Sequence, residues 1–229
     1  MPSPDQNMAA QCLAHPAGQL AIVDLTGQVR HDITYSALAE MADGLARALM
    51  ARVQVGDRVG VLLSQSPWCA AAHIAIWKIG AISVPLFKLF KYDALQSRVG
   101  DAVIQIVLTD DEGAGLLGDL AEPWMADTAG LAGGVVEMTA VETDTAGVLI
   151  YTSGTTGSPK GALHGHGVLG GHLVGVSLSH DHLGQSGDCL WTPADWAWIG
   201  GLFDVLMPGL ALGVPVVAAR MEKFDAEGC

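Results

Sequence analysis

The chain of 229 residues is long enough to bury one large hydrophobic core or two modest ones. Half of its residues are hydrophobic and 15% are charged, which indicates a globular rather than a disordered chain. The formal net charge of −13, with only 11 Lys and Arg residues, argues against nucleic acid or an anionic membrane surface as a partner.

After a polar N-terminal stretch, the first half of the chain predicts alternating strands and helices. Expected strands lie at 20–24, 58–63, 81–85 and 104–108, with a turn at Gly27 after the first, and expected helices at 38–49, 68–79 and 92–99. In the first helix, apolar residues recur at three- and four-residue spacing, and Ser36 is a candidate N-cap. Buried strands that alternate with helices predict an α/β fold with a mainly parallel sheet and helices on both faces.

A loop with the composition of a phosphate site follows the apolar run Ala146–Ile150, which predicts a buried strand. The loop holds hydroxyl groups, two glycines that can adopt positive φ, and one cation: Thr152, Ser153, Gly154, Thr155, Thr156, Gly157, Ser158, Pro159 and Lys160. Such a loop can turn successive backbone N–H groups toward one anion, so it predicts a polyphosphate cradle. The alternatives are a flexible Ser/Thr/Gly linker and the P-loop of NTPases. The P-loop motif fails because Pro159 and Gly161 flank the lysine.

The stretch Tyr151–Gly161 resembles the phosphate-binding signature of the AMP-forming acyl-CoA synthetases and their adenylating relatives, which include luciferases and peptide-synthetase adenylation domains. Shorter similarities follow in the family's order: Thr34-Tyr35, residues 56–59, Gly80-Ala81, residues 84–86 and, near the end, Phe224-Asp225. The resemblance implies an incomplete N-terminal domain of the adenylate-forming fold. Between Asp110 and Val148 the chain is shorter and richer in Gly and Ala than the family pattern, which is compatible with the loss of a strand–helix unit. We therefore divide the chain into 1–110, a shortened connection at 111–147, and 148–229.

A second patch, Leu190–Gly201, is similar to a stretch beside the acyl pocket of acetyl- and medium-chain acyl-CoA synthetases. The resemblance implies that Asp195 caps a helix, that Trp198 forms an apolar wall, and that Gly200 and Gly201 leave room for a substrate chain. The alternative is ordinary core packing by the tryptophans of this patch.

The apolar stretch 198–219 is long enough to span a membrane, but it contains Pro208 and Pro215. We expect a buried helix that stops near Pro208, a glycine-rich turn, and a strand at 214–218, rather than a transmembrane span.

The sequence predicts no metal ligands and no hydrolase nucleophile. The spacing of His164, His166 and His172 matches no compact zinc pattern, and Ser153 lacks the Gly-x-Ser-x-Gly elbow. The four cysteines are far apart and no basic, apolar leader precedes the chain, so we expect a cytoplasmic protein with free thiols.

The chemistry that the resemblance implies has two steps. A carboxylate, expected to be a short- or medium-chain fatty acid, attacks the α-phosphate of ATP to give acyl-adenylate and pyrophosphate, and coenzyme A then displaces AMP. Mg²⁺ and cationic side chains neutralise the phosphates in such transfers.

The chain ends at Cys229, before the adenine- and ribose-binding motifs and the C-terminal domain that carries the adenylation lysine in this family. We therefore expect no catalytic residues in the chain, negligible ligase activity on its own, and self-association through the apolar surface left exposed by truncation. The alternative is a non-catalytic, nucleotide-binding remnant or a partner subunit.

Overall fold

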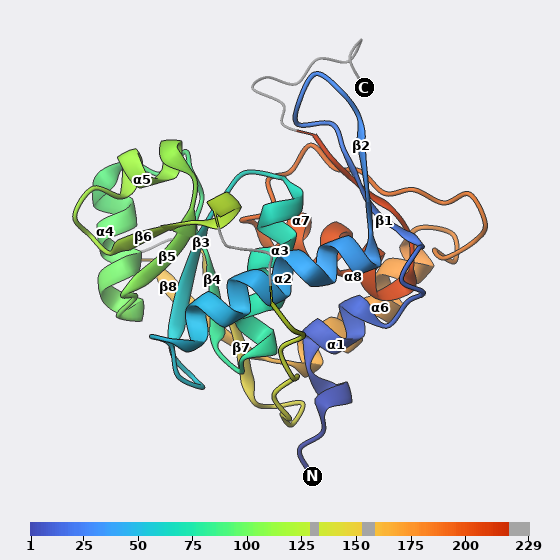
Figure 1. Ribbon diagram of the computed structural model, residues 1–229, viewed down its shortest axis with the longest axis horizontal. Coiled ribbons are helices and arrows are strands. Elements are labelled where there is room, and N and C mark those ends of the chain that lie inside the picture. The colour runs from blue at the N-terminus through green and yellow to red at the C-terminus, as the bar shows by residue number, and fades with distance from the viewer. Residues whose placement is uncertain (129–132, 153–158, 220–229) are drawn as a thin grey trace.

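The fold, seen in a computed structural model that describes residues 1–128, 133–152 and 159–219, contains two sheets (Figure 1). The larger sheet has six strands in the order β6-β5-β3-β4-β7-β8, and the smaller has three in the order β2-β1-β9. The strands are β1 (Leu20–Asp24), β2 (His31–Thr34), β3 (Arg58–Leu62), β4 (Ile82–Pro85), β5 (Ile106–Thr109), β6 (Glu122–Met125), β7 (Ala146–Thr152), β8 (Lys160–Gly165) and β9 (Val216–Ala218).

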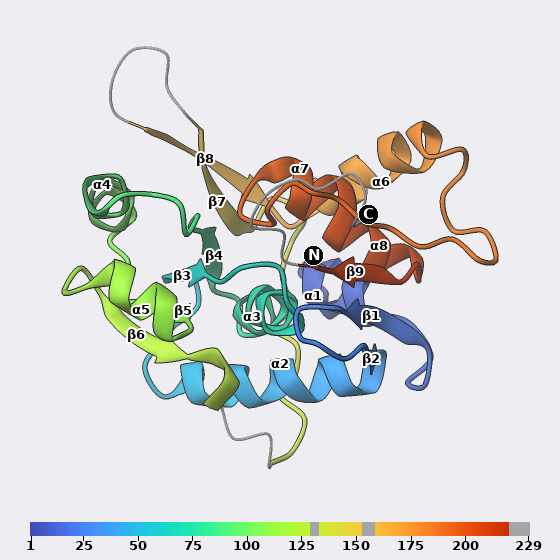
Figure 2. The same cartoon turned by 90° about the horizontal axis from the view of Figure 1, so that it is seen from above.

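The helices lie on both sides of the larger sheet and between the two sheets (Figure 2). They are α1 (Met8–Leu13), α2 (Tyr35–Met50), α3 (Pro67–Lys78), α4 (Tyr92–Ala102), α5 (Asp111–Leu117), α6 (Gly167–Ser179), α7 (Ile199–Gly201) and α8 (Met207–Leu212). Two short 3₁₀ helices, Pro4–Gln6 and Ala126–Thr128, and one π-helical turn, Leu202–Leu206, complete the described elements.

The larger sheet is mainly parallel, as the sequence predicts. Strands β3, β4, β5, β6 and β7 run in the same direction, and only β8 is antiparallel to its neighbour. Successive side chains along each strand point to opposite faces of the sheet. Val59 and Val61 join the core that contains α2 and α3, while Leu62 and Val107 join the core beneath α4 and α5. The α/β class is confirmed.

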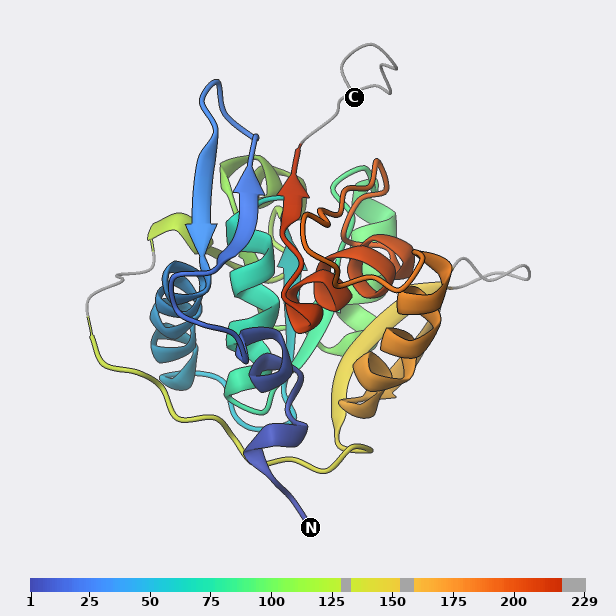
Figure 3. The same cartoon turned by 90° about the vertical axis from the view of Figure 1, so that its right-hand side faces the viewer.

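The smaller sheet brings together segments that are far apart in the sequence (Figure 3). Strand β1 pairs with β2 in antiparallel fashion and with β9, almost 200 residues away along the chain, in parallel fashion. Helix α3 packs centrally against α1 and α2 and is buried at nearly every position. A helix that is apolar on all sides is expected in such an interior place.

The start of α2 differs from the sequence prediction. Its N-cap is Thr34, whose side-chain oxygen accepts a hydrogen bond from the Ala37 N–H at 3.3 Å, and not Ser36. Ser36 lies inside the helix, where its hydroxyl is 2.9 Å from the Thr34 hydroxyl. Both residue types make good caps, so the backbone of the preceding strand decides between them.

The segment between Asp110 and Val148 contains a helix–strand unit, α5 and β6, that was not predicted from the sequence. Asp110 caps α5 by accepting a hydrogen bond from the Gly113 N–H at 2.9 Å, and β6 then pairs with β5. The larger sheet therefore continues through this shortened region to β6 at its edge.

We expected the helical segment at 199–212 to stop near Pro208, but it continues to Leu212. The π-helical turn Leu202–Leu206 leads directly into α8, whose first turn contains Pro208. Such a turn interrupts the regular i to i−4 hydrogen bonding next to the proline, which has no N–H group to donate. Gly213, with φ of +74°, then ends the helix before β9. Within the described ranges, no helix combines the length and apolarity that a membrane crossing requires.

Candidate functional site

The phosphate loop predicted from the sequence connects β7 to β8, which form an antiparallel hairpin (Figure 2). Thr152 at the end of β7 lies opposite Lys160 at the start of β8, and both side chains are exposed. Pro159 is partly buried beside them. The candidate residues Ser153, Gly154, Thr155, Thr156, Gly157 and Ser158 lie outside the described residues. The hairpin thus fixes the two ends of the loop side by side.

The loop follows the carboxyl end of a strand in the parallel part of the sheet. Strand β7 pairs in parallel with β4, with Ser83 opposite Val148, so Thr152 lies on the same edge of the sheet as the carboxyl ends of β3, β4 and β5. In open α/β sheets, ligands bind outside the carboxyl ends of the strands. The location of the loop fits this rule.

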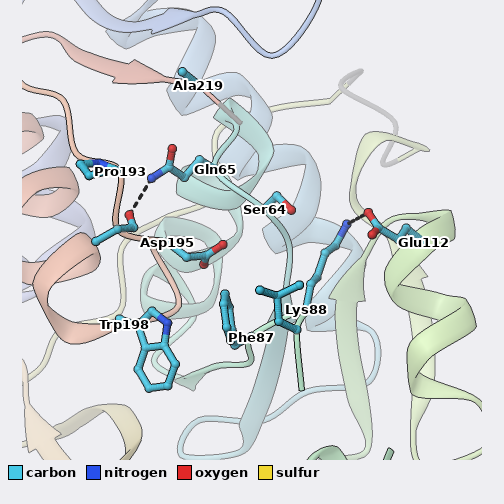
Figure 4. Close-up of a pocket in the computed structure, with 11 residues that line it drawn as sticks. Ser64, Gln65, Phe87, Lys88, Glu112, Pro193, Asp195, Trp198 and Ala219 are labelled. Carbon is cyan, nitrogen blue, oxygen red and sulfur yellow. Dashed lines mark hydrogen bonds and ion pairs between the residues drawn. The ribbon is translucent and has the colours of Figure 1, made fainter. Parts of the chain in front are cut away.

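A cavity of about 470 Å³ opens at this edge (Figure 4). Its lining residues come from segments that follow β3, β4, β5 and β9 and from the segment before α7: Ser64, Gln65, Phe87, Lys88, Leu89, Glu112, Pro193, Ala194, Asp195, Trp198 and Ala219. Two of the four residues predicted for a substrate pocket, Asp195 and Trp198, therefore lie together on its wall.

One side of the cavity is aromatic. The ring centroids of Phe87 and Trp198 are 5.2 Å apart, and Phe90, behind them, lies 5.6 Å from Phe87 and 5.9 Å from Trp198. Trp198 is 38% exposed, so it is not simply a core residue. Rings in this arrangement offer an apolar wall of fixed shape.

The opposite side of the cavity is charged. The Nζ of Lys88 lies 2.6 Å from Oδ2 of Asp110 and 3.0 Å from Oε2 of Glu112. The Lys88 side chain is buried, whereas the two carboxylates are about half exposed. The lysine charge is therefore compensated within the protein, and the cavity has one apolar and one polar end.

Asp195 shapes the wall of the cavity but does not cap α7, contrary to the prediction. Its Oδ1 accepts a hydrogen bond from the Ala197 N–H at 2.8 Å, which closes a turn before the helix, and Trp198 occupies the N-cap position of α7. Gln65 holds this segment against β3, because its Nε2 donates to the carbonyl oxygens of Thr192 and Ala194 at 3.1 and 2.7 Å.

Gly200 and Gly201 lie in α7, outside the lining of this cavity. A Cβ atom at Gly201 would collide with the backbone carbonyl of Asp195, so close backbone contact requires glycine there. At Gly200 the nearest atom to such a Cβ is Oδ2 of Asp204, at 3.7 Å. Their role in leaving room for a substrate chain stays a prediction.

The histidines of the second half do not gather around one point. His166 is buried, with its Nδ1 accepting a hydrogen bond from the Met8 N–H at 3.1 Å, while Nδ1 of His172 is 3.0 Å from Oδ1 of Asp204. The described residues contain no group of three or more His, Cys, Asp or Glu side chains that could hold a metal ion. Cys12, Cys69 and Cys189 are free thiols.

Several lining residues, among them Gln65, Phe87 and Lys88, were not predicted from the sequence. Each follows a strand that the sequence does predict, within a few residues of its carboxyl end. These residues could have been proposed from the rule that ligands bind at the carboxyl ends of parallel strands. The rule applies to many residues after each strand, however, and the fold is needed to choose among them.

A sequence profile of AMP-binding enzymes matches residues 8–228. The chain belongs to the AMP-binding enzyme family. The acetyl-coenzyme A synthetases of Halorhodospira halophila and Bradyrhizobium sp. (strain ORS 278) are 30% and 32% identical to it. Each alignment covers 90% of this chain and 38% of the relative, so this member of the AMP-binding family spans less than half the length of these relatives.

Solved structures show the same fold. The acyl-CoA synthetase of Brucella canis matches with a TM-score of 0.84 and 23% identity, over 97% of this chain and 44% of that protein. ATP-bound MatB from Rhodopseudomonas palustris matches with a TM-score of 0.80 and 23% identity, over 100% of this chain and 47% of that protein. This AMP-binding family member therefore has part of the adenylate-forming fold, as its sequence resemblance implies.

Proposed function

We propose that this chain forms the phosphate-binding and acid-binding part of an ATP-dependent, AMP-forming acyl-CoA synthetase. The observation that carries the proposal is the placement of two features on one edge of the sheet. The ends of the phosphate loop, Thr152 and Lys160, follow the carboxyl end of β7, and the cavity with Asp195 and Trp198 lies at the carboxyl ends of β3, β4 and β5.

In the proposed reaction a carboxylate oxygen attacks the α-phosphorus of ATP, the bond to the pyrophosphate oxygen breaks, and acyl-adenylate forms. The sulfur of coenzyme A then attacks the acyl carbon and AMP leaves. The loop from Thr152 to Lys160 would hold the β- and γ-phosphates, since it offers hydroxyl groups, backbone N–H groups and a lysine for phosphate oxygens. Mg²⁺, when bound to those oxygens, supplies further positive charge, and protein sites for Mg²⁺ commonly depend on substrate phosphates in this way.

The cavity supports a short- or medium-chain fatty acid as the carboxylate. Its volume of about 470 Å³ lies in the range of small-molecule sites, and the Phe87 and Trp198 rings suit an alkyl chain. Coenzyme A as the thiol acceptor follows from the family and from the names of the acetyl-coenzyme A synthetase relatives. The free thiols of Cys12, Cys69 and Cys189 support a reducing compartment such as the cytoplasm.

Binding of magnesium tripolyphosphate to this chain, measured by isothermal titration calorimetry, tests the phosphate site directly. We expect Lys160→Ala to weaken binding about tenfold or more, because a lysine contact to phosphate is a charge-assisted hydrogen bond worth roughly 1.5–3 kcal/mol. Lys91→Ala is the matched control, since Lys91 is also exposed but lies before α4. Equal binding by the Lys160 variant and the wild-type chain would contradict the proposal.

A further inference from the structure

Helix α4 connects the aromatic wall of the cavity to the strand that leads into the phosphate loop. Arg98 of this helix lies between two rings: its guanidinium carbon is 4.0 Å from the centroid of the Phe90 ring and 5.8 Å from that of Tyr151. Phe90 precedes α4 and Tyr151 lies in β7. One cation therefore contacts a residue from each side of the site.

Arg98 is an unusual residue to bury. It is 7% exposed, its Nη1 donates a hydrogen bond to the carbonyl oxygen of Ala94 at 2.7 Å, and its Nε has no hydrogen-bond partner among the described residues. Among the residues that the structure describes, Arg98 makes no ion pair with a carboxylate. Burial lowers the pKa of its guanidinium. The Ala94 carbonyl and the faces of the Phe90 and Tyr151 rings are the groups that face its charge, and an apolar side chain would fill the same space without the cost of burying a cation.

At one end of this connection is the cavity. Phe90 packs edge-on against both Phe87 and Trp198, at interplanar angles of 87° and 83°. Figure 4 shows Phe87 and Trp198 side by side on the cavity wall. A ligand that moves either ring also changes the surface against which Phe90, and through it Arg98, is packed.

At the other end is the phosphate loop. Tyr151 is 5% exposed, and its hydroxyl donates a hydrogen bond of 2.5 Å to Oδ2 of Asp101, one turn after Arg98 on α4. Burial and this hydrogen bond raise the pKa of Tyr151, so the phenol stays protonated and remains a donor. The next residue, Thr152, is the first of the loop. Helix α4 therefore holds the strand at the point where the loop begins.

We infer that Arg98 is a positioning residue that couples the two halves of the site, so that an acid in the cavity and a polyphosphate in the loop tighten each other's binding. The inference rests on the proposed function, because it assumes that both ligands bind. Coupling of this kind is reciprocal and typically amounts to 5- to 150-fold in affinity. It would make the loop bind polyphosphate best when the cavity already holds an acid.

The test measures the affinity of the chain for magnesium tripolyphosphate by calorimetry, with and without saturating octanoate. In the wild-type chain we expect octanoate to tighten tripolyphosphate binding at least fivefold, and tripolyphosphate to tighten octanoate binding by the same factor. In Arg98→Met, which keeps the length of the side chain but removes the cation, we expect this factor to fall below twofold. A merely structural role would lower the melting temperature without changing the factor.

Three further variants make the result decisive. Arg30→Met removes an arginine whose ion pair, with Asp32, lies at the smaller sheet rather than on α4, and it should keep the wild-type factor. Tyr151→Phe removes only the hydroxyl group and should reduce the factor. Phe90→Leu removes the aromatic ring that contacts Arg98. If the Arg98→Met variant does not fold, Phe90→Leu is used in its place to test the inference.

The outcomes separate the two proposals. A wild-type chain that binds no tripolyphosphate overturns the proposed function. A wild-type chain that binds tripolyphosphate but not octanoate, or binds both without coupling, overturns the inference alone. The inference is also overturned if Arg98→Met, or Phe90→Leu when it is used in its place, keeps the wild-type coupling between octanoate and tripolyphosphate binding.

Discussion

Asp43 of α2 and Lys78 of α3 form a buried ion pair that ties three segments together. Their Oδ1 and Nζ atoms are 2.5 Å apart, and both side chains are at most 7% exposed. The same Oδ1 accepts a hydrogen bond from the Val136 N–H at 3.0 Å, and the Lys78 carbonyl accepts one from the Thr139 N–H at 2.9 Å. The pair thus holds the strandless segment before β7 against the two helices.

Replacing Asp43 with Asn should destabilise the chain by about 3–5 kcal/mol, because it leaves the Lys78 charge buried without a partner. Chemical denaturation monitored by circular dichroism measures this loss. Asp32→Asn is the control, because Asp32 pairs with Arg30 on the surface and its loss should have little effect. We also expect Asp43→Leu combined with Lys78→Met to be more stable than either single variant. A double variant no better than the singles would contradict this account.

Two buried histidines predict a loss of stability in mild acid. Burial lowers the pKa of His73 to about 3 and that of His166 to about 4, and Nδ1 of His73 has no hydrogen-bond partner in the part of the chain that the structure describes. In the unfolded chain a histidine titrates near pH 6.5, so below this pH the unfolded state binds more protons. The free energy of unfolding is therefore unaffected by these groups above pH 6.5 and falls by about 1.4 kcal/mol per pH unit for each histidine as the pH drops toward 4.

Denaturation at a series of pH values between 6 and 4.5 checks this expectation. His73→Leu should make the slope shallower by about 1.4 kcal/mol per pH unit, since the neutral side chain gains no proton on unfolding. His31→Gln, at an exposed position on β2, should leave the slope as it is. A wild-type slope in the His73 variant would show that its ring is not kept neutral by burial.

Among the helices and strands, the sequence predicts those in which apolar residues recur at a regular spacing or form a continuous run. Helix α2 has its apolar residues on one face, and β3, β4 and β5 are buried runs between turn residues, so all four are found. Strands β6 and β8 are missed because they lie at the two edges of the larger sheet. Edge strands carry polar residues, proline and glycine, as in Glu122-Pro123 and Lys160-Gly161, and their pattern is weak.

The site is predictable to a similar degree. The proposed phosphate loop is continuous in the sequence, so its composition alone is enough to propose its chemistry. The cavity is assembled from residues after four different strands, and pairs such as Gln65 with Ala194 depend on tertiary structure. The contact of Arg98 with Phe90 and Tyr151 likewise joins two segments that are not neighbours in the chain.

For the molecule as a whole, exposed apolar side chains on α6 and β8 predict self-association. Leu163, Val174 and Leu178 are 58%, 67% and 62% exposed, and α6 contains no Asp, Glu, Lys or Arg residue. The net charge of −13 opposes contact between copies, so we expect association to increase with salt concentration. Light scattering after size-exclusion chromatography, at several protein and salt concentrations, measures it.

The combined variant Val174→Glu and Leu178→Glu should shift the chain toward monomer. Val29→Glu with Val135→Glu is the control, because these two valines are also well exposed, at 64% and 82%, but do not belong to α6. If the control dissociates the chain as well as the α6 variant does, net charge rather than this surface governs association.

The hairpin formed by β7 and β8 affects how the sequence of the proposed phosphate loop can change during evolution. Thr152 and Lys160 lie opposite each other in the antiparallel pair of β7 and β8, so the hydrogen bonds between these strands hold the two ends of the loop together. Doubling the length of a flexible loop costs only about 0.6 kcal/mol in closure entropy. We therefore expect that a loop of different length from another family member can be joined to Thr152 and Lys160 without rebuilding the sheet beneath them.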